Sequence, residues 1–205
     1  ITDAETFARD WTVIDVNSDV SANTWAYNDG NAMYMQDKSN AADDWLIAPA
    51  VTLEAGKAYK VSAYVKHSST FGSDKQKIEL KIGTAPTVEG LTTRLVYDES
   101  FQSRLFVEKS GTFSPAESGV FYVGLRCYSE SYNGDLYFQK IVIEEAPVYP
   151  AQITDLSIVA GERGAMSATL SWTWPSSDHL GGALSNLLGA KIYRGTDLVA
   201  TLDTA

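Results

Sequence analysis

Apolar and polar residues alternate with a period of two through most of the first 145 residues. Because successive side chains of a β-strand point to opposite faces, such alternation predicts half-buried strands. In 57–67 it places Tyr59, Val61, Ala63 and Val65 on one face, with Lys60, Ser62, Tyr64 and Lys66 on the other. In 75–83 we expect Ile78, Leu80 and Ile82 to face a core and Lys77, Glu79 and Lys81 to face water.

About nine or ten strands of this kind are expected before residue 145. The clearest candidates are 11–15, 32–36, 45–48, 57–67, 75–83, 93–98, 104–109, 119–129 and 135–145. No stretch of ten or more residues carries the apolar stripe and the caps of a helix. The first part of the chain is therefore predicted to be all-β, an antiparallel β-sandwich.

The pattern changes at EEAPVYPAQ, residues 144–152, which holds Pro147 and Pro150 and has no periodicity. This reads as a linker, so we predict a domain over 1–145, a linker over 146–152 and a second unit over 153–205. Strands are expected there at 153–161, 166–174 and 190–202. Because a complete sandwich of this type needs about seven strands and roughly 90–100 residues, we expect the second unit to be truncated and the natural protein to continue.

Composition excludes several function classes. Twenty-six acidic residues against 16 basic ones give a net charge of −10, which argues against a nucleic-acid partner because phosphate binding needs clustered Lys and Arg. No apolar run approaches the roughly 18 residues of a membrane-spanning helix, so no membrane insertion is expected from this segment. With two His, one Cys and no nucleophile motif, we predict a chain that is not an enzyme. The single Cys127 is expected to be a buried, inert thiol.

One loop is suggestive of metal binding. Asp15, Asn17 and Asp19 offer oxygen atoms at alternate positions, which is the ligand type that calcium requires. Asp43 is the next candidate, so we predict a structural calcium held by Asp15, Asn17, Asp19 and Asp43. The alternative is an Asx-rich turn whose side chains bond their own backbone.

Aromatic side chains in loops are the candidate ligand contacts. Trp11 and Trp45 have apolar neighbours and are expected in the core. Trp25 lies beside polar turn residues and is predicted to be more open, and Tyr27 belongs to the turn that follows it. Tyr128 and Tyr132 belong to a polar loop between two strong strands, where binding residues concentrate. We predict that these last four contact a glycan or a protein.

The motifs of the first unit resemble those of the cleaved-adhesin, or choice-of-anchor J, domains found in secreted proteins of Bacteroidetes, including gingipain haemagglutinin regions. The matching positions are Trp11, Asp15, Asn17, Asp19 and Trp25, then Asp43, Asp44, Trp45, Leu46, Ile47 and Pro49. GDLYFQKIVI at 134–143 stands where the family has its closing strand, although Gln139 and Lys140 replace two acids that are common there. The resemblance covers about residues 5–145. It implies a jelly-roll-like β-sandwich with adhesion or with carbohydrate or protein binding, and with calcium in several members.

The second unit resembles the first strands of a fibronectin type III domain, an immunoglobulin-like sandwich, with Trp172 in its second strand. Together these features predict a non-catalytic module of a secreted or bacterial cell-surface protein. Its partner would be a host or matrix protein or a glycan. The alternatives are a carbohydrate-binding accessory domain of a secreted hydrolase and a structural spacer.

Overall fold

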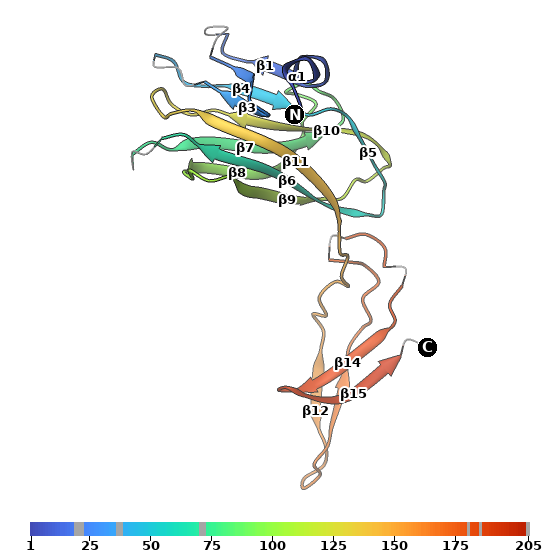
Figure 1. Cartoon of the computed structure of the whole chain (residues 1–205). Coiled ribbons are helices and arrows are strands. Elements are labelled where there is room, and N and C mark those ends of the chain that lie inside the picture. Colours follow the sequence, from blue (N-terminus) through green and yellow to red (C-terminus); the bar gives the residue numbers. More distant parts are fainter. Residues whose placement is uncertain (19–22, 36–38, 70–72, 180, 185, 204–205) are drawn as a thin grey trace. The chain divides into compact units, whose positions relative to one another are not determined.

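The computed structural model describes residues 1–18, 23–35, 39–69, 73–179, 181–184 and 186–203. The chain divides into two compact units, Ile1–Ala146 and Pro147–Ala205, and Figure 1 shows the strands that build each of them.

Two antiparallel sheets form the first unit (Figure 1). The six-stranded sheet has the order β1-β4-β10-β7-β8, with β5 paired to β10. Its strands are β1 Thr12–Asp15, β4 Asp44–Ile47, β5 Val51–Leu53, β7 Gln76–Gly83, β8 Thr93–Phe101 and β10 Gly119–Cys127. The five-stranded sheet has the order β2-β3-β11-β6-β9. Its strands are β2 Trp25–Asn28, β3 Asn31–Tyr34, β6 Ala58–His67, β9 Val107–Phe113 and β11 Leu136–Ala146. The predicted all-β antiparallel sandwich is confirmed.

The main core lies between the two sheets and follows the predicted alternation. Ile78, Leu80 and Ile82 of β7 are 0–1% exposed. They belong to one buried cluster with Val65 of β6 and Phe138 of β11. Because burying a large aliphatic or aromatic side chain contributes about 1.5–3 kcal/mol, this shared cluster is what holds the sheets face to face.

Strand β4 is buried on both faces. Leu46 joins the main core, whereas Trp45 and Ile47 form a second cluster on the outer face with Leu91. Leu91 comes from the segment between β7 and β8, which folds back over Gly124 and Trp45. A strand that is covered on both faces has a continuous run of apolar residues rather than an alternation of apolar and polar ones.

Three short elements were not predicted: β2, β5 and the helix α1, Ala4–Asp10. They span three to seven residues, too few for a period to emerge. The helix begins after Asp3, whose carboxylate accepts the amide N–H of Thr6 at 2.7 Å, as expected of an N-cap. Its one buried residue is Phe7, which stacks on Trp11, and Trp11 in turn packs against Phe138.

The second unit holds two antiparallel pairs of strands. β12 Ser157–Ala160 pairs with β13 Ala168–Ser171, and β14 Gly189–Arg194 pairs with β15 Asp197–Asp203. Trp172 and Trp174 lie edge to face, 5.6 Å between ring centroids. The resemblance of this unit to a fibronectin type III domain stays a prediction.

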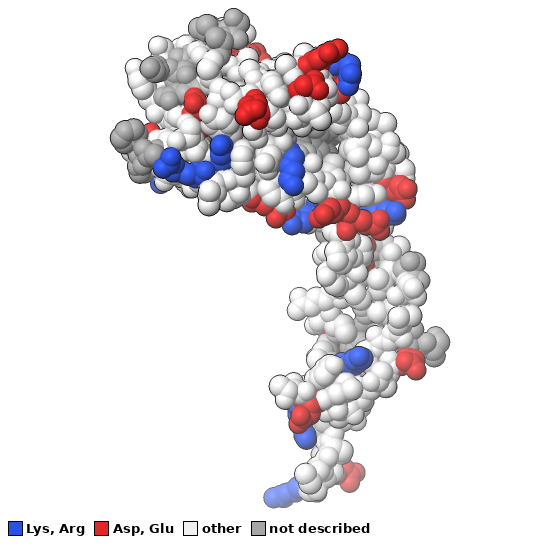
Figure 2. All heavy atoms as spheres, in the orientation of Figure 1, with Lys and Arg blue, Asp and Glu red and all other residues white. Residues whose placement is uncertain are grey.

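Figure 2 shows acidic and basic side chains interspersed on the face that it presents, with wide uncharged areas between them. The net charge of −10 is therefore not gathered into one patch on that face.

Candidate functional site

The outer face of the six-stranded sheet carries a row of side chains that runs across five strands. The backbone register aligns Ile14 of β1 with Trp45, Trp45 with Arg126, Arg126 with Glu79, and Glu79 with Tyr97 of β8. Cross-strand neighbours on one face lie close enough for their side chains to touch. The row therefore joins residues from widely separated parts of the chain into one surface.

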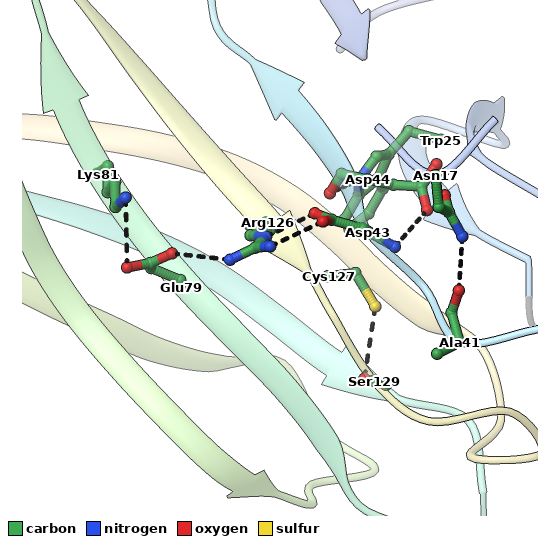
Figure 3. Close-up of polar contacts among 10 residues, drawn as sticks. All are labelled: Asn17, Trp25, Ala41, Asp43, Asp44, Glu79, Lys81, Arg126, Cys127 and Ser129. Carbon is green, nitrogen blue, oxygen red and sulfur yellow. Dashed lines mark hydrogen bonds and ion pairs between the residues drawn. The ribbon is translucent and has the colours of Figure 1, made fainter. Parts of the chain in front are cut away.

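Glu79 lies at the centre of this row and is buried. The side chain is 3% exposed, so the expectation that it faces water is wrong. Its carboxylate pairs with Nε of Arg94 at 2.7 Å, with the Arg126 guanidinium at 3.5 Å and with Nζ of Lys81 at 3.6 Å. Figure 3 shows the carboxylate between Lys81 and Arg126. Three cations compensate for the water that the carboxylate has lost, as a buried charge requires.

The same cations lie over aromatic rings. Arg94 is 4.6 Å from the Tyr97 ring centroid, and Tyr97 stacks on Tyr128 with centroids 6.0 Å apart. Arg126 lies 5.0 Å from Tyr128 and 5.7 Å from Trp45, and Lys81 lies 5.4 Å from Trp45. Each of these cation–ring distances is within the range of a cation–π interaction. We call this set the aromatic–cationic cluster: Trp45, Glu79, Lys81, Arg94, Tyr97, Arg126 and Tyr128.

Arg126 also pairs with Asp43, the residue before β4. Its Nε and Nη2 donate to both carboxylate oxygens of Asp43 at 2.7 and 2.8 Å, a two-pronged pairing that fixes the guanidinium plane (Figure 3). Hydrogen bonding to Asp43 raises the pKa of Arg126 further above its ordinary value. Burial, with Tyr97 adding to it, raises the pKa of Tyr128, so the phenol stays protonated at neutral pH.

Only one member of the cluster, Tyr128, was among the predicted ligand contacts. Tyr97 and Arg94 stand in an unremarkable strand, and no local pattern marks them. The alternation in β7 does place Lys81 and Glu79 on the outer face. That alternation is the one signal in the sequence for this site, and it carries no information on which strands lie beside β7.

The described members of the predicted calcium set, Asp15, Asn17 and Asp43, are brought to one corner of the sheet, where each already makes a hydrogen bond. Val16 N–H donates to the Asp43 carbonyl at 2.9 Å, which places the loop that follows β1 beside Asp43. Asp15 Oδ1 accepts Ser18 N–H at 2.6 Å, and Asn17 Nδ2 donates to the Ala41 carbonyl at 2.6 Å. The Asp15 contact is the local side-chain-to-backbone bond of an Asx turn, whereas the Asn17 contact ties this loop to the segment before β4.

Asp43 does not fit the predicted ligand set, because both of its carboxylate oxygens already pair with Arg126, whose positive charge would repel a cation. Asp19 lies outside the described residues. Within the described part of the chain, no group of three or more His, Cys, Asp or Glu side chains is placed to hold a metal ion. A structural calcium at this corner stays a prediction.

The predicted openness of Trp25 is wrong. The side chain is 2% exposed, and its Nε1 donates across the sandwich to the Asp44 carbonyl at 3.2 Å. Its indole face is therefore not available to a ligand. Tyr27, two residues further along β2, is half-buried, and its hydroxyl lies 3.5 Å from the Thr2 carbonyl. Neither residue is on the sheet that carries the aromatic–cationic cluster.

The loop over 128–135 is held firmly at its base and presents Tyr132 at its tip. The Gln76 amide donates to the carbonyls of Asn133 and Gly134 at 3.0 and 2.5 Å, and the buried His67 ring contacts the Asn133 carbonyl. Tyr132 is 63% exposed and has a backbone φ of +63°. The loop thus combines a fixed backbone with one free aromatic ring.

Cys127 is a structural residue rather than a nucleophile. It is 0% exposed, and its thiol donates to Gln76 Oε1 at 3.3 Å. Burial raises its pKa to about 12, so the reactive thiolate is not formed at neutral pH.

Among the described residues, no helix has the length and apolar character needed to cross a membrane.

Comparison with known proteins identifies the fold. No protein-family model matches the chain, and no curated protein matches its sequence. Among solved structures, the K1 cleaved adhesin domain of Lys-gingipain from Porphyromonas gingivalis W83 is similar, with a TM-score of 0.50 and 13% identity over 67% of this chain and 91% of that one. The K3 domain of the same protein has a TM-score of 0.49 and 12% identity over 65% and 90%.

A carbohydrate-binding module described as CBM4 has a TM-score of 0.46 and 14% identity over 71% of this chain and 93% of its own. At these identities the comparisons bear on architecture alone. The first unit has the β-sandwich fold of the K1 cleaved adhesin domain.

Proposed function

We propose that this chain is a non-catalytic ligand-binding module of a secreted or cell-surface protein, with adhesion as its role and the aromatic–cationic cluster as its contact surface. The observation that carries the proposal is the state of Tyr97. This ring is 49% exposed although it stands in a row of fixed side chains on a regular sheet. An amphipathic ring that is immobilised before binding loses little entropy when a ligand covers it.

Several further features support a binding role. The cations of the cluster are oriented by Glu79 and by aromatic faces, so that they are pre-arranged on a rigid scaffold. The fold is shared with a domain named as an adhesin. Tyr97 at 49% and Tyr132 at 63% exposure are not what the structural-spacer alternative expects, since that alternative requires the aromatics to be buried.

A carbohydrate-binding accessory role in a secreted hydrolase is the second candidate function. It is favoured by the combination of an exposed tyrosine ring with guanidinium groups on one face. A pyranose ring presents C–H groups on its faces and hydroxyls on its rim, and the cluster offers an aromatic surface to the former and N–H donors to the latter.

The test is a binding screen of the whole 205-residue chain on a glycan array, on immobilised matrix proteins and on cells. Tyr97→Ala should weaken binding at least about tenfold, because truncating a central aromatic contact costs about 2 kcal/mol or more. Tyr193→Ala is the matched control: it removes a ring of similar exposure, 55%, from the second unit, and it should leave binding unchanged.

Tyr132→Ala, tested beside these variants, separates the loop from the sheet. If Tyr132→Ala abolishes binding and Tyr97→Ala does not, the contact surface is the loop over 128–135. If neither variant differs from the unmodified chain on any surface, the proposed function is wrong.

A further inference from the structure

We propose that the ligand of the aromatic–cationic cluster is an acidic glycan, with a carboxylate or sulfate group of the sugar held between Arg94 and Lys81. This inference rests on the proposed function, because it names the ligand class of the same surface.

The first argument is the placement of two like charges opposite each other. Lys81 of β7 and Arg94 of β8 are direct cross-strand partners, and both reach the Glu79 carboxylate on the outer face. Like charges directly opposite on neighbouring strands are destabilising. The buried carboxylate of Glu79 relieves part of this repulsion. A negative group of a ligand, placed between Lys81 and Arg94 from the solvent side, would relieve more of it.

The second argument is the balance of charge. Three cations, Lys81, Arg94 and Arg126, form ion pairs with two carboxylates, Glu79 and Asp43. A third carboxylate, Glu99, accepts the hydroxyl hydrogen of Tyr97 at 2.7 Å. Asp43 contacts only Arg126 among these cations, which leaves Lys81 and Arg94 to share Glu79 with Arg126. On the Lys81–Arg94 side, two cations therefore share one carboxylate that also pairs with Arg126.

The third argument is donor geometry. Arg94 uses Nε to bond Glu79, and its side chain is 56% exposed. The terminal amino groups of a guanidinium form a planar fork that fits the two oxygens of a carboxylate or sulfate. Since Arg94 also lies over the Tyr97 ring, 4.6 Å from its centroid, two contacts restrict the position of that fork before a ligand arrives.

The surroundings of the cluster favour a sugar over other anions. The half-exposed Tyr97 lies beside the fork, and its exposed apolar atoms can pack against a pyranose. An added peptide strand would bind through backbone groups at a sheet edge, whereas the cluster consists of side chains on the face of the sheet, including the central strands β10 and β7.

The experiment compares matched polymers by titration calorimetry on the whole chain. Polygalacturonate is paired with its fully methyl-esterified form, and dextran sulfate with dextran, so that each pair differs in the acidic group alone. We expect the chain to bind at least one acidic polymer about tenfold or more tightly than its neutral counterpart, as one charge-assisted contact would provide. Higher salt should reduce this preference. The two pairs also show whether the group recognised is a carboxylate or a sulfate.

Charge variants locate the site. Arg94→Gln and Lys81→Gln should each remove most of the preference for the acidic polymer, whereas Arg94→Lys should retain part of it. Arg104→Gln is the control: Arg104 is exposed in the segment between β8 and β9, and its loss changes the net charge by the same amount. Thermal melts establish that the variants are folded. If Arg94→Gln does not fold, the result for Lys81→Gln decides whether the site is correctly assigned.

The outcomes separate this inference from the proposed function. If acidic and neutral polymers bind equally and Tyr97→Ala weakens both, the proposed function stands and the acidic ligand is refuted. If Arg104→Gln costs as much as Arg94→Gln, the attraction is diffuse and the assigned site is wrong. If none of the four polymers binds, the inference fails, while the screen on matrix proteins and cells decides the proposed function independently.

Discussion

Replacing Glu79 with Gln is the sharpest test of the network on the outer face. The substitution preserves the shape of the side chain and removes its charge. The carboxylate at this position pairs with Arg94, Arg126 and Lys81. Without it, Arg94 loses its 2.7 Å ionic hydrogen bond, and Lys81 and Arg94 face each other with no compensating charge between them.

The size of the effect follows from burial. Breaking a fully buried ion pair by removing one partner costs about 3–5 kcal/mol, and an exposed pair contributes about 0–1 kcal/mol. Glu79 belongs to the first class, with its side chain 3% exposed, but the side chains of Arg94 and Arg126 are 56% and 29% exposed and retain part of their hydration. We therefore expect Glu79→Gln to lower the free energy of unfolding by about 2–3 kcal/mol. For a unit of this size that is a fall of about 5–10 °C in Tm.

The assay is urea unfolding followed by tryptophan fluorescence, with Glu130→Gln as the matched control. Glu130 pairs with Lys77 at 2.8 Å, but its side chain is 69% exposed, so its loss should cost about 0–1 kcal/mol. A Glu79→Gln variant within 0.5 kcal/mol of the unmodified chain, on the scale where about 1 kcal/mol marks a surface pair, would refute the central role given to this carboxylate. An equal effect of the two variants would refute it as well.

Four further predictions each concern one position in the chain. Cys127, with its pKa raised to about 12 by burial, should not react with a thiol reagent at pH about 8 in the folded chain, but should react fully in urea. Gly124→Ala should destabilise the first unit by about 1–3 kcal/mol in the same unfolding assay, because a Cβ there would lie 2.4 Å from Leu91 Cδ1 and 3.1 Å from Trp45. Burial opposes ionisation of Asp98, but Lys109 and the Ser100 N–H lower its pKa overall. The stability that this gives is present above the unfolded pKa of about 4 and is lost as the pH falls through the folded pKa. Asp98→Asn should therefore flatten the acid limb of a pH–stability curve. If calcium is bound near Asp15, a chelator should lower Tm and elemental analysis should find the metal; an unchanged Tm with no metal present contradicts that prediction.

The strands could be predicted because their signal is local. Side-chain alternation in β7 marks Ile78, Leu80 and Ile82 as core without reference to any other part of the chain, and all three are buried. The same alternation assigned Glu79 to water. Glu79 is buried because the side chains of Arg94 in β8 and Arg126 in β10 cover it. The register between distant strands cannot be predicted from any one segment.

Trp25 illustrates the opposite error. Its sequence neighbours are polar, so it was predicted to be open, yet its indole N–H bonds the Asp44 carbonyl of the facing sheet. Local polarity describes the loops on either side of a residue, whereas burial depends on which sheet lies opposite. The candidate site was missed for the same reason, since its members come from β4, β7, β8 and β10 and meet only after the sheet has formed.

The placement of two cations opposite each other distinguishes the aromatic–cationic cluster from the outer face of the other sheet. On the outer face of the five-stranded sheet, Lys60 pairs with Glu108, and Lys66 and Lys140 each lie over the tyrosine ring that is their cross-strand partner. In the aromatic–cationic cluster, by contrast, the cross-strand partner of Lys81 is a second cation, Arg94. Within the aromatic–cationic cluster, aromatic rings take much of the place of carboxylates: Arg94 lies on Tyr97, and Lys81 on Trp45. A ring face fixes the position of a cation without cancelling its charge. A surface selected for stability alone would gain from a second carboxylate between Lys81 and Arg94, which share Glu79. The acidic ligand that we propose would supply that carboxylate or a sulfate from outside the chain.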